Sequence, residues 1–86
     1  MTSDLNLQPN IGKDTENKLI QVGINSYAEL VAAGTEQAFL RLQTIDPGAC
    51  IQLLYGIEGA IQGIPANSLP NDKKQELREF NLMVKK

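Results

Sequence analysis

Residues 7–24 read LQPNIGKDTENKLIQVGI, and this stretch does most to decide the fold. A Pro-Asn pair and an Ile-Gly pair predict a tight turn, which is followed by a short helix over residues 13–22. Gly23 suits the left-handed residue that closes a helix, and Ile24 would then contact Leu19. The stretch therefore predicts a turn, a helix and an abrupt stop.

The remaining boundaries are marked by capping and stop residues. A short opening helix is expected over residues 3–7. Ser26 and Glu29 have the spacing of a capping box, which starts a helix that Gly34 ends. Another helix is expected over residues 35–45. No segment alternates polar and apolar residues over the length of a strand, so strands are not expected.

The most apolar segment, residues 47–63, is predicted to be the central helix of the core. Asp46 suits its N-cap, and Pro47 suits the first helical position, where the missing N–H costs nothing. Cys50 lies on the apolar stripe and is interpreted as a buried small hydrophobic residue. A last helix is expected over residues 71–84. The stripe of the central helix comprises Cys50, Leu53, Leu54, Ile57 and Ile61.

Small residues at Gly56, Ala60 and Gly63 are expected to share one face of the central helix. Glycine in a helix interior costs about 1 kcal/mol relative to alanine, so a compensating contact is expected. The favoured interpretation is close packing against a neighbouring backbone. The alternative is a groove for a ligand along the same face.

An 86-residue chain is expected to form one domain, residues 1–86. Only 5% of the residues are aromatic and none is Trp, so the core must be aliphatic. We therefore predict an all-α, compact bundle of five to six short helices. The single Cys fits a reducing cytoplasm, and the N-terminus lacks the features of a signal peptide. The longest apolar stretch, residues 49–64, is too short to span a bilayer, so no membrane partner is expected.

No combination of residues predicts catalysis. The chain has no His and its Cys is expected to be buried, so the usual nucleophile–base pairs cannot form. No residues have the spacing of a metal site or of a Gly-rich phosphate loop. We expect a non-enzymatic protein with no catalytic residue, metal or cofactor. Eight basic and ten acidic residues give a net charge of −2, which argues against tight DNA binding by the overall field alone.

Residues 10–24 resemble the helix-hairpin-helix motif, whose common pattern is GIGPKTAEKLLEAGI. In that motif the amides of the turn and of a helix N-terminus face a phosphate. Here Asn10 replaces the first Gly of the pattern, Lys13 replaces Pro and Glu16 replaces Ala. The alternative interpretation is a tight turn whose Ile fills the core. The matching positions are Ile11, Gly12, Thr15, Lys18, Leu19, Gly23 and Ile24. The resemblance implies candidate nucleic-acid contacts at Asn10, Ile11, Gly12, Lys13 and Lys18.

Residues 45–64, IDPGACIQLLYGIEGAIQGI, resemble the C-terminal domain of TfoX/Sxy-type competence regulators. Shorter similarities before and after this run extend the resemblance over most of the chain. It implies a helical domain of the helix-hairpin-helix or SAM-domain-like type. It also implies a role in regulating DNA-uptake genes together with a transcription activator. The N-terminal domain of full-length family members is expected to be absent here.

Two functions remain open. The first is a regulatory domain that contacts DNA backbone through the hairpin. The second is a protein-interaction module that docks a transcription regulator, or itself, without touching DNA. The cations of the last helix, between Lys73 and Lys86, favour a solvated face with ion pairs. The alternative is a basic patch that joins the hairpin lysines in space.

Overall fold

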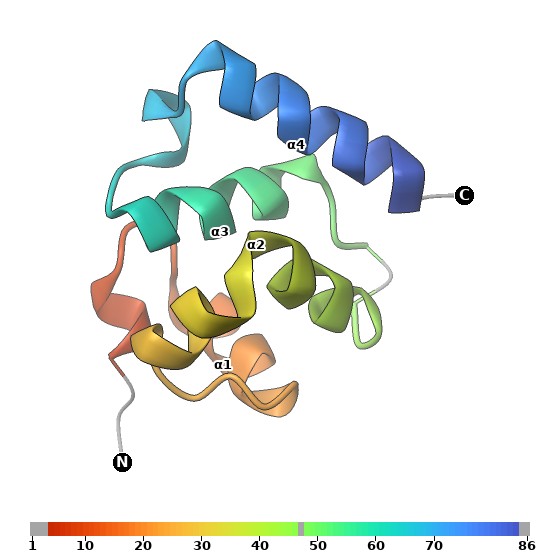
Figure 1. Cartoon of the computed structure of the whole chain (residues 1–86). Coiled ribbons are helices and arrows are strands. Elements are labelled where there is room, and N and C mark those ends of the chain that lie inside the picture. The colour runs from red at the N-terminus through yellow and green to blue at the C-terminus, as the bar shows by residue number, and fades with distance from the viewer. Residues whose placement is uncertain (1–3, 47, 85–86) are drawn as a thin grey trace.

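The computed structural model describes residues 4–46 and 48–84, and every regular element in them is helical (Figure 1). The all-α prediction is confirmed. Instead of five to six short helices, these residues form four α-helices and two 3-10 turns. In chain order they are η1 (Leu5–Leu7), α1 (Lys13–Gln21), α2 (Tyr27–Gln43), α3 (Ile51–Gln62), η2 (Ala66–Ser68) and α4 (Asn71–Val84).

Gly34 bends α2 where the sequence predicted two separate helices. Its φ of 83° and ψ of 163° are not helical, and a positive φ is a conformation that glycine adopts without strain. The two halves of α2 therefore meet at a kink. Just after the kink, the buried Thr35 donates a hydrogen bond of 2.7 Å from its hydroxyl to Glu58 Oε1, which ties the second half of α2 to α3.

The predicted end of α1 and start of α2 are confirmed. Gly23 has a φ of 89°, and the Ile24 amide donates to the Leu19 carbonyl at 2.9 Å. At the start of α2, Ser26 Oγ accepts from the Glu29 amide at 3.2 Å. The Glu29 carboxylate reaches back and accepts from the Asn25 amide at 2.8 Å.

The start of α3 differs from the prediction. The helix begins at Ile51, and its N-cap is Cys50 rather than Asp46. Asp46 instead closes a local turn, because its Oδ1 accepts from the Gly48 amide at 3.0 Å. Pro47, predicted at the first helical position, lies outside the described residues. The predicted burial of Cys50 is wrong: the thiol is exposed, because an N-cap residue is extended and lies off the apolar stripe of its helix.

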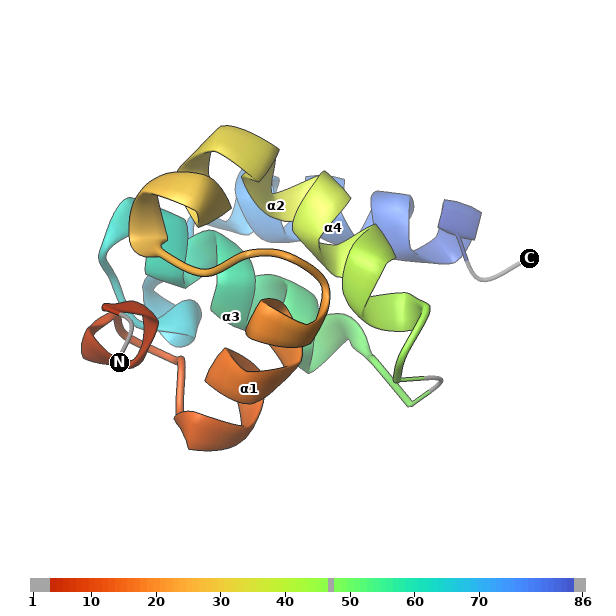
Figure 2. The same cartoon turned by 90° about the horizontal axis from the view of Figure 1, so that it is seen from below.

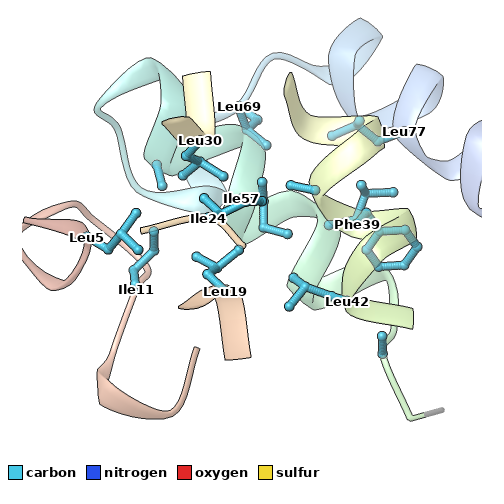
Figure 3. Packing of buried hydrophobic residues seen from close by; sticks show 14 residues of the cluster. Leu5, Ile11, Leu19, Ile24, Leu30, Phe39, Leu42, Ile57, Leu69 and Leu77 are labelled. Carbon is cyan, nitrogen blue, oxygen red and sulfur yellow. The ribbon is translucent and has the colours of Figure 1, made fainter. Parts of the chain in front are cut away.

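α3 is the central element, as predicted, and contacts α2, α4 and η2. In Figure 1, α4 lies on one side of α3 and α1 lies on the other, and the view from below in Figure 2 agrees. Figure 3 shows the aliphatic side chains that meet between these elements. The Phe39 and Phe80 rings meet edge to face, with centroids 6.4 Å apart. The fully buried large residues are Phe39, Leu5, Leu19, Ile24, Leu30, Leu42, Leu54 and Ile57.

The glycines of α3 allow close packing, but the set differs from the predicted one. A Cβ atom on Gly59 would lie 2.6 Å from Asn10 Nδ2 and 2.7 Å from the Ile64 carbonyl. Gly56 lies against Asn10 as well, at an ordinary contact distance of 3.5 Å. Gly63, which we expected on the packing face, is the left-handed C-cap of α3 with a φ of 77°. The close neighbour is thus the hairpin around Asn10.

Candidate nucleic-acid interface

The candidate site is the hairpin between η1 and α1. Asn10 has a φ of 70°, the left-handed conformation that Asn tolerates better than most residues. Its Nδ2 donates to the Ile64 carbonyl at 3.0 Å and to the Gly56 carbonyl at 3.4 Å. Its Oδ1 accepts from the Ala66 amide at 3.1 Å. The side chain therefore fastens the hairpin to the end of α3 and to η2.

Ile11 points the opposite way, into the core. It is 5% exposed and lies with Leu5 and Leu19 at one end of the apolar cluster (Figure 3). This agrees with the interpretation in which the Ile of the turn fills the core. The next two residues, Gly12 and Lys13, are exposed.

Gly12 is the N-cap of α1, and no side chain caps that helix. The first amides of a helix have no intrahelical partners, so this end presents N–H groups and the positive end of the helix dipole. A Cβ atom on Gly12 would find nothing within 4 Å, so the surroundings of the cap are open. Lys13 is exposed beside it.

Lys18 lies one turn further along α1 and is engaged with two carboxylates. Its Nζ is 2.9 Å from Asp46 Oδ2 and 3.1 Å from Asp14 Oδ2. The hydrogen bond to Asp46, followed by that to Asp14, raises the pKa of Lys18. The hydrogen bond from Lys18, followed by that from the Gly48 amide, lowers the pKa of Asp46. Lys18 thus joins the hairpin helix to the turn before α3.

The five residues predicted to contact nucleic acid therefore have different roles in the fold. Gly12 and Lys13 lie together at the open end of α1. Asn10 and Ile11 hold the hairpin in place, and the charge of Lys18 is partly neutralised by its neighbours. Glu16, which replaces an Ala of the motif, is 8% exposed.

The basic residues of α4 make different contacts. Lys73 pairs with Glu76 at 2.9 Å, and this hydrogen bond is the main cause of its raised pKa. Arg78 donates from Nη1 to the Tyr55 hydroxyl at 3.3 Å. Lys74 lines a hollow that Asn10 also lines. Lys85 and Lys86 lie outside the described residues.

This hollow was missed from the sequence, and it brings the hairpin and α4 to one place. It has a volume of about 400 Å³. Nothing local could have predicted it, since its walls come from positions up to 64 residues apart and are joined by the Asn10 hydrogen bonds. We call it the Tyr55 hollow; it is lined by Asn10, Gln52, Tyr55, Pro65, Ala66, Asn67 and Lys74.

Residues 4–46 and 48–84 hold neither a cluster of metal ligands nor a helix that could span a membrane. Among them, no three His, Cys, Asp or Glu residues are grouped so that they could hold a metal ion. None of the helices in this part of the chain has the length and apolar character needed to cross a membrane.

Comparison with known proteins identifies relatives along nearly the whole chain. The sequence profile of the family described as "TfoX C-terminal domain" matches residues 1–81. Protein Sxy of Escherichia coli K12 is 35% identical over 72 residues, which are 84% of this chain and 34% of Sxy. The chain thus corresponds to about a third of that relative.

Two crystal structures of Listeria monocytogenes proteins of unknown function have the same fold. A triclinic form is 42% identical, with a TM-score of 0.92, and the match covers 94% of this chain and 92% of the other. A tetragonal form is 43% identical, with a TM-score of 0.89, and the match covers 92% and 98%. With the profile match over residues 1–81, the chain belongs to the TfoX C-terminal domain family.

Proposed function

We propose that this TfoX C-terminal domain is a non-enzymatic regulatory domain that contacts nucleic-acid backbone at the start of α1. The observation that carries the proposal is the open helix N-terminus at Gly12, which has no side-chain cap and no crowding atoms, with Lys13 beside it. Exposed amides, a helix dipole and one lysine together favour a phosphate. Family membership, shared with Protein Sxy, relates the domain to competence regulation.

The expected affinity is modest. The net charge is −2, and Lys18 is already paired with Asp14 and Asp46, so few phosphates would be neutralised. A weak, backbone-directed contact is what a regulatory domain would add to the binding of a partner.

A second function rests on a different surface. Leu82 and Met83 of α4 are 67% and 68% exposed. Large apolar side chains beside one another favour a protein contact. In this alternative the domain docks a transcription regulator or a second copy of itself, and the hairpin is a structural turn.

Titration of the purified domain with fluorescent duplex and single-stranded DNA, at low and moderate salt, tests the proposal. We expect binding that weakens as salt rises, in proportion to the phosphates neutralised. Lys13→Glu should abolish it, and Gly12→Ala should weaken it because a methyl group would stand between the amides and the phosphate. The control is Lys73→Glu, which makes the same charge change on α4. Absence of binding at low salt would refute the proposal and favour the protein-docking alternative.

A further inference from the structure

The Tyr55 hollow is open to solvent and is lined by residues from four parts of the chain: the hairpin, α3, the η2 segment and the start of α4. Its walls are fastened together, because Asn10 bonds to the Ile64 carbonyl at 3.0 Å and to the Ala66 amide at 3.1 Å. The hollow is therefore built into the fold and does not depend on a bound ligand to form.

The lining combines an aromatic ring with free carboxamides. The Tyr55 side chain is half-buried, and its hydroxyl accepts a hydrogen bond from Arg78, which fixes the position of the phenol oxygen. Pro65 and Ala66 add apolar surface. Gln52 and Asn67 are exposed, and within residues 4–46 and 48–84 their carboxamides form no hydrogen bond. Aromatic rings that stack and polar side chains that hydrogen-bond to base edges are the groups that proteins use for unpaired nucleobases.

The charged residues that line the Tyr55 hollow differ from those of a second hollow. Lys74 is the charged residue of its lining, and Arg78 reaches Tyr55 from the same helix. A second hollow, of about 310 Å³, lies near the kink of α2 and contains Lys73, but three carboxylates also line it: Glu36, Glu58 and Glu76. Although the protein has a net charge of −2, the described residues that line the Tyr55 hollow include a lysine and no carboxylate, so the lining does not repel an anion.

We propose that the Tyr55 hollow receives an unpaired base of single-stranded nucleic acid. The base stacks on Tyr55 and is bonded at its edge by Gln52 or Asn67, while Lys74 and Arg78 face the adjoining phosphate. This inference rests on the proposed function, because the hairpin that would hold the backbone also supplies the Asn10 wall of the hollow. A site for an unpaired base gives the domain a preference for single-stranded over duplex nucleic acid.

The test compares two fluorescent strands of equal length and charge, an oligothymidine and its abasic counterpart. Stacking of one base on an aromatic side chain predicts that the thymidine strand binds at least about fivefold more tightly. Tyr55→Leu should remove this preference and leave the affinity for the abasic strand unchanged. Tyr55→Phe keeps the ring and should keep the preference. Lys74→Gln should weaken both strands, and its matched control is Lys73→Gln, which should change neither.

The outcomes separate this inference from the proposed function. Equal binding of the two strands would overturn the base site and leave the backbone contact standing. A preference that persists in a folded Tyr55→Leu variant, with an unchanged thermal midpoint, would place the base elsewhere and also overturn it. Failure of both strands to bind at low salt would refute the two proposals together.

Discussion

The side chain of Asn10 packs directly against Gly59: a Cβ atom on residue 59 would lie 2.6 Å from Asn10 Nδ2. Real Cβ atoms essentially never approach another atom so closely, and the Ile64 carbonyl is also only 2.7 Å away. The glycine of α3 and the asparagine of the hairpin therefore depend on each other. The hairpin can lie against α3 only because position 59 has no side chain.

Two glycines on the same helix should consequently respond in opposite directions to alanine. At Gly56 the nearest atom is 3.5 Å from the new methyl group, so the gain in helix propensity of about 1 kcal/mol should be retained. Gly59→Ala forces backbone atoms apart and should cost about 1–3 kcal/mol, as overpacking does. Urea denaturation of both variants checks this, and an equal shift in the two midpoints would contradict the close approach.

Substitutions of Asn10 separate its hydrogen bonds from its backbone conformation. Asn10→Gly loses three hydrogen bonds but keeps a residue at ease with a φ of 70°, and should cost about 1–3 kcal/mol. Asn10→Ala loses the same bonds and adds left-handed strain of about 1–2 kcal/mol. The ranking is measured by equilibrium unfolding. If the alanine variant were as stable as the glycine variant, the left-handed conformation would be wrong.

Cys50 offers a stabilising substitution. It is the N-cap of α3, and its side chain accepts no hydrogen bond from the first turn. Cys50→Ser supplies a preferred N-cap hydroxyl and should raise the free energy of unfolding by about 0.5–1 kcal/mol. Because the native thiol is exposed, it should also react with a thiol reagent without unfolding. Labelling as slow as global unfolding would show that Cys50 is buried after all.

The Lys18–Asp46 pair predicts a pH dependence with two limits. The pKa of Asp46 is lowered from its ordinary value of 3.8, so its contribution is full above that value and is lost as pH falls through the lower folded pKa. The pKa of Lys18 is raised from 10.5, so its contribution is full below that value and is lost as pH rises through the higher folded pKa. The stability difference between wild type and Asp46→Asn should therefore be constant from about pH 5 to pH 9 and shrink at both extremes.

Urea titrations across this range measure the difference, with Glu36→Gln on the exposed surface of α2 as the control for a lost carboxylate. The control should not reproduce the profile. A difference that changes most near neutral pH would show that another titrating group controls this turn.

A helix boundary could be predicted from the sequence where it depends on residues close by in the chain. Gly23 closes α1 and Ser26 with Glu29 opens α2 through hydrogen bonds that span at most five residues. The start of α3 could not be predicted in this way. Asp is favoured both in turns and at N-caps, and only the tertiary fold decides which role Asp46 has. Of the two partners of Lys18, Asp46 is 28 residues away, and no local pattern indicates it. For the same reason the Tyr55 hollow could not be predicted.

The Asn10 side chain also has a consequence for the order of events during synthesis. Its bonding partners are translated 46 to 56 residues after it. A nascent chain that has not yet released residue 66 from the ribosome therefore carries a hairpin without its anchor. The hairpin is made before its partners and can acquire its final geometry only after they follow, so chains truncated or stalled before residue 66 would lack an anchored hairpin even when α1 itself has formed.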